Sequence, residues 1–300
     1  MNELYYYIHN FLKPTYNQES FIRSKINSIV SVMRNNSELS LRETRKGGSF
    51  EKGTMLKYNP EADIVLVFNK QTGKKRNWDN LMNIVQKNLE ENFPEIEIVE
   101  SGMIRHRIFF KNNEEKIFFD IVPSYYVDSP LQIASHVKSK IYQGITTIWH
   151  IDYFNRNKNL PNFIDVIMLL KDWRNEHKIP LKSFHLELIT VSAYHYRVEN
   201  CNSIENILTG CFKEIQGMLD GKSVFPINWD HYSEDDIIRD YTIPCIIDPA
   251  NPKDNLLTKI KKEDCVYIKK ETLMAINQLN NREYGKIFDP KNYTKHFKQM

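Results

Sequence analysis

The sequence predicts an α+β fold in which a mixed α/β lobe precedes a mainly helical lobe. Apolar residues from Ile8 to Met33 recur at spacings of three, four and seven, as on one face of a helix. Between residues 39 and 122 the pattern changes to short β-branched and aromatic runs, which are typical of strands. Helical spacing returns from about Ser135. Because 300 residues exceed the usual size of one domain, we expect two lobes, residues 1–150 and 151–300.

The first lobe is expected to begin with helices and to continue as a sheet. Pro14 interrupts the N-terminal pattern, so two helices with a break are expected, and they would brace both lobes. Residues 64–68 are apolar at every position, which suits a strand buried on both faces. Residues 78–92 fit a helix. Further strands are expected at residues 39–42, 95–99, 105–110 and 116–122, the last two joined by a turn at 111–114.

The second lobe is expected to be built from amphipathic helices. Apolar residues at helical spacing cover residues 163–177, 183–196 and 204–219. The chain shows no internal repeat and no low-complexity tail. These features predict an ordinary packed helical lobe.

The composition excludes several classes of protein. Apolar residues make up 41% and charged residues 26%, as in a globular protein and unlike a disordered chain. No apolar run approaches the ~18 residues that a membrane-spanning helix needs, so we expect no membrane partner. The N-terminus carries Glu3 and no small-residue cleavage site, which predicts a cytoplasmic protein. The net charge of +3 does not by itself require a nucleic-acid partner.

The cysteines do not predict a disulfide framework. The four of them form no CxxC pair, so reduced thiols are expected. His195, Cys201 and Cys211 could supply three zinc ligands, but their spacing fits no common zinc site. We expect them instead to be buried or helix-borne residues.

A glycine pair marks the first of three segments that could form a binding or catalytic site. Gly47, Gly48 and Ser49 follow an expected strand. Adjacent glycines let the backbone approach a ligand closely, and amides there can bind phosphate oxygens. Taken alone, Gly-Gly-Ser is more typical of a plain turn.

Three acidic residues form the second and third segments. Glu61 and Asp63 point the same way from an extended chain, where Mg²⁺ could lie between them; a solvated acidic turn is the alternative. Asp120 lies in an otherwise apolar strand, which predicts a paired or metal-bound carboxylate, with a hydrogen-bonded structural Asp as the alternative. If the two strands are neighbours, the three carboxylates could hold two metals for an in-line displacement.

These segments together resemble a known family. A Gly-Ser turn, a spaced acidic pair and a third Asp on a later strand are the pattern of the DNA polymerase β-like nucleotidyltransferases. Lys46-Gly47-Gly48-Ser49 with Lys52-Gly53-Thr54, followed by Ala62-Asp63, closely resembles the oligoadenylate synthetases. Asp120-Ile121-Val122-Pro123 resembles their third-carboxylate segment.

The second lobe carries segments that resemble the same family. Leu170-Lys171-Asp172-Trp173 resembles its Lys-x-Trp helix, and residues 183–191 resemble its Leu-Glu-Leu-Leu-Thr-Val segment. Ser183-Phe184-His185 is similar to the Ser-Tyr-His of cyclic GMP–AMP synthase. Residues 247–252 resemble Asp-Pro-Ala-Asp-Pro, with Asn251 in place of the second Asp. The resemblance places the chain among the cGAS/DncV-like (CD-NTase) and oligoadenylate-synthetase nucleotidyltransferases.

The resemblance implies a fold and a set of roles. It implies a polymerase β-like lobe, with a mixed sheet flanked by helices, and a helical lobe, with a central active-site cleft. Gly48 and Ser49 would hold the donor triphosphate. Glu61, Asp63 and Asp120 would bind Mg²⁺, or Mn²⁺, and Asp120 would also help to deprotonate the attacking ribose hydroxyl.

The same resemblance assigns nucleotide contacts in the second lobe. Lys171 and Ser183 would contact the donor phosphates, and Phe184 would stack on a base in place of the family's usual Tyr. From the residues alone, Lys171 fits a solvated helix lysine and Phe184 a core aromatic.

The sequence also departs from its relatives. Oligoadenylate synthetases usually have Asp at the position of Glu61, where cyclic GMP–AMP synthase has Glu; either residue can ligate Mg²⁺. The zinc insertion of cyclic GMP–AMP synthase is absent, since Cys201 has no adjacent cysteine, which argues against DNA sensing of that type. Basic residues that could contact double-stranded RNA, or be solvated, are Arg42, Arg45, Lys46, Lys70, Lys74, Lys75 and Arg76.

The sequence therefore predicts a nucleotidyltransferase that condenses ATP and other nucleoside triphosphates into a cyclic or short linear oligonucleotide signal, with release of pyrophosphate. The modest length and charge and the missing zinc insertion favour a bacterial enzyme of antiphage signalling. The alternative is a 2′-5′ oligoadenylate synthetase activated by double-stranded RNA; a protein activator is the other expected partner. RNA-end tailing and a catalytically inactive nucleotide- or RNA-binding scaffold are less favoured.

Overall fold

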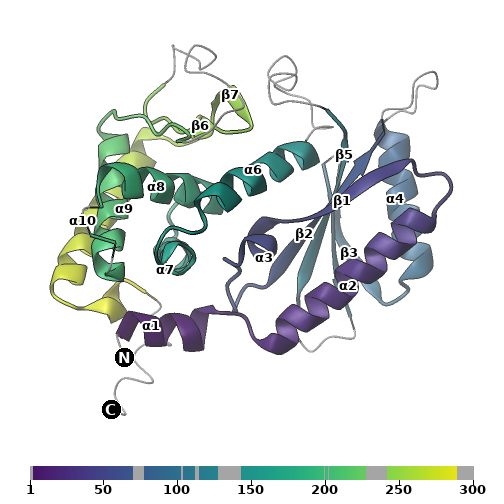
Figure 1. The fold of residues 1–300 in the computed structure, drawn as a ribbon, viewed down its shortest axis with the longest axis horizontal. Helices are drawn as coiled ribbons and strands as arrows, with labels where there is room; N and C mark the ends of the chain where they lie inside the picture. Colours follow the sequence, from purple (N-terminus) through teal and green to yellow (C-terminus); the bar gives the residue numbers. More distant parts are fainter. Residues whose placement is uncertain are drawn as a thin grey trace. The chain divides into compact units, whose positions relative to one another are not determined.

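The computed structural model describes residues 3–69, 78–102, 104–111, 115–127, 143–198, 200–201, 203–227 and 242–288. Contacts within the chain group residues 14–152 as one unit and residues 1–13 with 153–300 as the other. The first 13 residues thus group with the C-terminal unit, whereas the sequence pattern placed them in the first lobe. The ribbon is drawn in Figure 1.

The unit of residues 14–152 is built on a five-stranded mixed sheet in the order β1-β2-β5-β4-β3. β2 and β5 are parallel, and the remaining neighbours are antiparallel. The strands are β1 (Leu41–Gly47), β2 (Glu61–Phe68), β3 (Ile96–Ser101), β4 (His106–Phe110) and β5 (Phe118–Tyr125). A mixed sheet with its one parallel pair at β2–β5 brings together two strands that lie far apart in the sequence (Figure 1).

Helices α2 (Tyr16–Asn35) and α4 (Trp78–Asn92) pack on one face of this sheet (Figure 1). The buried core between them takes alternate residues of each strand, including Ile64 and Leu66 of β2 and Phe119 and Ile121 of β5. Because side chains of a strand alternate between faces, the intervening residues of β2, β4 and β5 project from the other face of the sheet.

That other face receives the start of α6 (Gln143–Asn157). A Cβ added at Gly144 would lie 2.6 Å from Ser124 Cβ and 2.8 Å from Val65 Cγ1, so only glycine lets the helix approach β2 and β5 this closely. The Ser124 hydroxyl accepts a hydrogen bond from the backbone N–H of Ile145 at 3.1 Å. The start of α6 is therefore anchored to β5.

The N-terminal helical pattern breaks at Pro14, as predicted. α1 (Glu3–Tyr7) and the π-helical turn η1 (Ile8–Leu12) precede it, and α2 follows. Thr15 caps α2, accepting from the Gln18 N–H at 3.2 Å while the Gln18 side chain accepts from the Thr15 N–H at 2.8 Å. This capping box explains why the second helix begins directly after the proline.

The other unit is mainly helical, as the sequence predicts. It contains α7 (Phe163–Glu176), α8 (Ser183–Tyr196), α9 (Ile204–Leu219) and α10 (Lys262–Asn280), with the short turn η4 (Tyr284–Lys286). Within it, the Tyr7 hydroxyl donates to Asp172 Oδ2 at 2.9 Å, which ties the start of the chain to α7. Along the described chain, no helix has both the length and the apolar character required of a bilayer-spanning segment.

The structure adds elements that the sequence reading did not contain. A two-stranded hairpin of β6 (Ile247–Asp248) and β7 (Asn251–Asn255) holds the segment with Asn251, and α10 follows it. The glycine pair is not the plain turn that Gly-Gly-Ser alone would suggest, because Gly47 ends β1 and Gly48 begins the short helix α3 (Gly48–Lys52). Most of the predicted hairpin turn at 111–114 lies outside the described residues.

Candidate active site

Strand register places the predicted acidic residues in one row across the sheet. Asp63 of β2 lies opposite Asp120 of β5 in the parallel pair. β1 lies on the other side of β2, where Gly47 is opposite Asp63. β4 lies on the other side of β5, where Arg107 is opposite Asp120. Glu61 is two residues before Asp63 on the same strand and therefore projects from the same face. The predicted neighbourhood of the two acidic strands is thus present.

The glycine pair approaches this row closely. A Cβ added at Gly48 would lie 1.5 Å from Asp63 Oδ2, so any other residue at this position would overlap the carboxylate. Gly48 also has φ +61°, a conformation that L side chains rarely adopt. Ser49, in the first turn of α3, is partly exposed next to it. The backbone of Gly48 therefore borders Asp63, and Ser49 is the next residue along the chain.

Burial and charge crowding both change the acidity of Asp63. Burial, the larger cause, and the negative charges of Asp120 and Glu61 together raise its pKa to about 7. The charges act in this direction because an ionised Asp63 would be a third like charge in the same place. The positive charges of Lys52 and Arg105 act in the opposite direction. A cation bound beside Asp63 would keep this carboxyl ionised at neutral pH.

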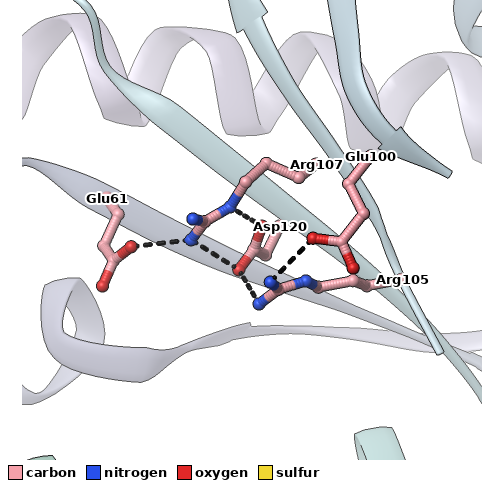
Figure 2. A network of polar contacts seen from close by, with 5 residues as sticks. All are labelled: Glu61, Glu100, Arg105, Arg107 and Asp120. Carbon is pink, nitrogen blue, oxygen red and sulfur yellow. Dashed lines mark hydrogen bonds and ion pairs between the residues drawn. The ribbon is translucent and has the colours of Figure 1, made fainter. Parts of the chain in front are cut away.

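Two arginines of the β4 region neutralise Asp120, as Figure 2 shows. Arg107 Nε donates to Asp120 Oδ1 at 2.7 Å, and Arg105 Nη1 donates to Asp120 Oδ2 at 2.7 Å. Arg107 Nη2 donates to Asp120 Oδ2 at 3.0 Å and to Glu61 Oε2 at 2.8 Å. Arg105 Nη2 extends the network to Glu100 Oε2 at 3.0 Å. The hydrogen bonds to Asp120 raise the pKa of Arg107 above its ordinary value.

The arginines and Lys52 are site residues that the sequence reading missed. Arg105 and Arg107 are two residues apart in a predicted strand, so the alternation that pairs Glu61 with Asp63 also places both arginines on one side of the chain. Two basic residues at this spacing in a predicted strand were the sequence signal that could have identified these arginines. Lys52 was part of the recognised motif and is buried near Asp63.

The donor set fits Mg²⁺ in chemistry and in strand register. Glu61, Asp63 and Asp120 supply carboxylate oxygens from one face of adjacent strands, and magnesium prefers oxygen ligands. Among the described residues, no three His, Cys, Asp or Glu side chains already converge on one point. Arg107 Nη2 lies between Glu61 and Asp120 instead, so convergence on an ion requires these carboxylates to leave the guanidinium.

The remaining predicted contacts belong to the helical unit. Lys171 is buried in α7, unlike the solvated lysine that the residues alone suggested. Ser183 begins α8 and its hydroxyl accepts from Arg174 Nη1 at 2.9 Å. Phe184 follows it and is partly buried. The roles of Lys171, Ser183 and Phe184 towards a nucleotide stay predictions.

His185 and Cys211 of the helical unit are buried. The pKa of His185 is lowered to about 3, chiefly by burial, and its Nδ1 accepts from the Lys182 N–H at 3.2 Å at the start of α8. Cys211 is buried in α9, and burial raises the pKa of its thiol to about 12. The buried position expected for Cys211 is confirmed.

The sequence is similar to curated oligoadenylate synthases. It is 22% identical to 2′-5′-oligoadenylate synthase 2 of Mus musculus, and the alignment covers 82% of this chain and 39% of that protein. The human 2′-5′-oligoadenylate synthase 2 is 23% identical, and the alignment covers 82% of this chain and 40% of that protein. The chain thus spans about two fifths of the length of these relatives. No family model matches the sequence.

The structure is similar to solved nucleotidyltransferases along nearly its whole length. E. coli CdnC, solved with ATP, superimposes with a TM-score of 0.74 at 18% identity, covering 94% of this chain and 91% of that one. The Cid1 poly(U) polymerase superimposes with a TM-score of 0.67 at 15% identity, and the superposition covers 92% of each chain.

A second CD-NTase agrees with this likeness. CdnG of Bradyrhizobium diazoefficiens, solved with GTP, gives a TM-score of 0.65 at 12% identity, with 97% of this chain and 96% of that one covered. At these identities the likeness to solved structures establishes the fold. The chain therefore has the polymerase β-like nucleotidyltransferase fold, and its predicted resemblance to the CD-NTases and the oligoadenylate synthetases is confirmed.

Proposed function

We propose that this protein is a nucleotidyltransferase that joins nucleoside triphosphates into a cyclic or short linear oligonucleotide. The observation that carries the proposal is the row of Asp63 and Asp120 on paired strands, with Glu61 on the same face and Gly48 against Asp63. The neighbours CdnC and CdnG, solved with ATP and GTP, support nucleoside triphosphates as the substrates.

In the proposed reaction, a ribose hydroxyl of one nucleotide attacks the α-phosphorus of another. A new P–O bond forms, the bond to the β-phosphate oxygen breaks, and pyrophosphate leaves. The Gly48 backbone and the Ser49 hydroxyl bind the triphosphate, and Asp120 accepts the proton of the attacking hydroxyl. Glu61, Asp63 and Asp120 would hold Mg²⁺, which would supply charge neutralisation for the triphosphate.

The test is a turnover assay with purified protein, Mg²⁺ or Mn²⁺, and all four labelled triphosphates. Products are treated with phosphatase and identified by mass spectrometry, with and without double-stranded RNA. A phosphatase-resistant product formed without RNA would establish a cyclic-oligonucleotide synthase. We expect Asp63→Asn and Asp120→Asn to lower product formation by at least about 100-fold, since both remove proposed metal ligands.

Asp79→Asn is the matched control. Asp79 is an exposed residue in the first turn of α4, away from the row of carboxylates, so the same chemical change there should leave turnover unchanged. Equal activity of Asp63→Asn and Asp79→Asn would contradict the proposed site. Binding of RNA or nucleotide without turnover under every condition would instead support an inactive scaffold.

The second candidate is a 2′-5′ oligoadenylate synthetase activated by double-stranded RNA. The sequence likeness to two such synthases over 82% of this chain favours it. A phosphatase-sensitive adenylate ladder that appears only with RNA would establish this alternative.

Two of the basic residues that could contact RNA make contacts within the chain. The Arg42 guanidinium carbon lies 3.5 Å from the ring centroid of Tyr126, and Arg45 Nε lies 3.5 Å from Glu43 Oε2. Both cations are therefore engaged within the chain. The basic residues Lys70, Lys74, Lys75 and Arg76 lie outside the described residues.

A protein activator and an antiphage role stay predictions. One structure of CdnC is a complex with a HORMA protein, which makes an activator of that kind reasonable to test in the same assay. Stimulation of turnover by a co-purifying protein would support it.

A further inference from the structure

One nitrogen of Arg107 contacts two of the proposed metal ligands. Arg107 Nη2 is 2.8 Å from Glu61 Oε2 and 3.0 Å from Asp120 Oδ2, as Figure 2 shows. Its Nε is 2.7 Å from the other oxygen of Asp120. The guanidinium thus occupies both oxygens of one proposed metal ligand and one oxygen of a second.

Burial makes these contacts strong. The Asp120 side chain is 7% exposed, so water can compensate little of its charge and a cation must do so. The Arg107 side chain is 24% exposed and its guanidinium carbon lies 5.2 Å from the ring centroid of Phe118, which holds it over β5. A divalent ion on the same oxygens would stand within a few ångströms of this positive charge, where the two cations repel strongly.

From this geometry we propose that Arg107 is a built-in competitor of the divalent cation, displaced from Glu61 and Asp120 when the ion binds. The inference rests on the proposed function, since it takes these carboxylates as metal ligands. The arginine satisfies the buried charge of Asp120 until the ion arrives, and it sets the ion concentration at which the site fills.

Arg105 differs from Arg107 in a way that predicts a smaller effect. It contacts Asp120 through one nitrogen and pairs through the other with Glu100, whose side chain is 52% exposed. It makes no bridge to Glu61 among the contacts of Figure 2. Arg105 can therefore keep its contact with Glu100 when an ion binds, whereas Arg107 must release both carboxylates.

A scaffold role for Arg107 makes the opposite prediction. If the guanidinium only oriented Asp120 for the ion, its removal would weaken metal binding, because the ligand would lose its support. A competitor, when removed, strengthens metal binding. The sign of the change in affinity therefore separates the two roles.

The experiment measures Mn²⁺ binding to the full-length protein without nucleotide, by the electron paramagnetic resonance signal of free Mn²⁺ at pH 8. We expect Arg107→Met to bind Mn²⁺ roughly tenfold more tightly than wild type, since two charge-assisted contacts with Asp120 and one with Glu61 are removed. Arg107→Lys keeps the charge and should stay close to wild type. Arg45→Met is the matched control, because Arg45 pairs with Glu43 outside the site, and should also stay close to wild type.

Weaker or unchanged Mn²⁺ binding by Arg107→Met would overturn the inference. Asp63→Asn shows whether the measured ion is at the proposed site, because it should lose Mn²⁺ binding. If Asp63→Asn loses binding and Arg107→Met does not gain it, the competitor role alone fails. If Asp63→Asn binds Mn²⁺ like wild type, the metal site of the proposed function fails.

A second measurement uses the wild-type protein and does not depend on the folding of a variant. The Nε–H resonance of Arg107, assigned with Arg107→Lys, reports the hydrogen bond to Asp120 Oδ1. Titration with Mg²⁺ should shift this resonance towards that of a solvent-exposed arginine and speed its hydrogen exchange. A resonance that keeps its position while Mn²⁺ binding is intact would contradict displacement.

Discussion

Two buried carboxylates in this protein are held by arginines but differ in their surroundings. Glu214 of α9 is fully buried, and its Oε1 accepts from Ser192 Oγ at 2.5 Å. Its Oε2 accepts from Arg197 Nε at 2.8 Å and from Lys222 Nζ at 3.4 Å. A Cβ added at Gly217 would lie 2.7 Å from Arg197 Nη2, so the glycine leaves room for this ion pair.

Asp120 is held just as closely but shares its arginines with other acids. Arg107 serves Asp120 and Glu61 together, and Asp63 lies opposite Asp120 on the next strand. One carboxylate is thus fully satisfied by its own partners, whereas three carboxylates share a limited positive charge. The difference teaches that burial and pairing alone do not single out a carboxylate, whereas crowding of like charges marks a candidate functional site.

The largest expected effect is on the free energy of unfolding when Arg197 or Arg107 is replaced. Arg197→Met should lower the free energy of unfolding by about 3 kcal/mol, because it leaves the fully buried Glu214 with only a partly exposed lysine as its cation. Arg107→Met should cost about 1 kcal/mol, since Asp120 keeps Arg105. Urea unfolding followed by circular dichroism measures both.

Mg²⁺ sharpens this comparison. The ion should restore the stability of Arg107→Met, because it replaces the lost positive charge, and should leave Arg197→Met unchanged. Equal costs for the two variants, or equal responses to Mg²⁺, would remove the distinction between the two carboxylates.

The second prediction concerns pH and Asp63. Its pKa of about 7 in the folded protein exceeds the ordinary value of 3.8, so between these values the folded chain binds a proton that the unfolded chain has released. Stability therefore falls as the pH rises from about 4 through 7 and stays low above 7. Asp63→Asn should lack this loss, so its advantage over wild type should grow to on the order of a few kcal/mol at pH 8.

The measurement is urea unfolding of wild type and Asp63→Asn from pH 4 to pH 8 in the presence of a chelator. The difference in unfolding free energy between the two proteins removes the contributions that other titrating groups make equally to both. A stability difference that does not change with pH would show that the pKa of Asp63 is not raised in the folded protein.

The third prediction tests the close approach of Gly48. Gly48→Ala should lower stability by about 2 kcal/mol, because its Cβ would lie 1.5 Å from Asp63 Oδ2 and its φ is positive. Gly47→Ala is the control, with a Cβ 3.1 Å from Asp63 Cβ and a negative φ, and should cost less. In an Asp63→Ala background the overlap is absent, so the cost of Gly48→Ala should fall; an unchanged cost would assign it to the backbone alone.

The smallest expected effect is the stabilisation of wild type by Mg²⁺. At an ion concentration ten times its Kd, the free energy of unfolding should rise by about 1.4 kcal/mol. Asp63→Asn should show no such rise, because it lacks a proposed ligand. A thermal melt with and without Mg²⁺ checks this, and equal shifts in both proteins would point to binding elsewhere.

Much of the fold followed from local patterns. The helices over residues 78–92, 183–196 and 204–219 match the expected ranges, since their apolar spacing is a property of each segment by itself. The hairpin of β6 and β7 was missed because its strands are short and polar, and it depends on Asn255, whose Oδ1 accepts from the Ile246 and Leu257 N–H groups at 3.1 and 3.0 Å.

The sequence by itself determined which side chains share a face. Alternation along a strand places Glu61 with Asp63, and Arg105 with Arg107, whatever lies beside them. The adjacent glycines likewise indicated a close backbone approach, although the sequence did not say to which group.

Only the tertiary structure decided which strands are neighbours and in which register. The parallel pairing of β2 and β5 places Asp63 opposite Asp120, and the antiparallel β4 places Arg107 opposite Asp120, although Arg107 and Glu61 are 46 residues apart. Register depends on packing between distant segments, and a shift of one residue would send these side chains to the helix-covered face. The encounter of acids and arginines is therefore a property of the assembled sheet and not of any one segment.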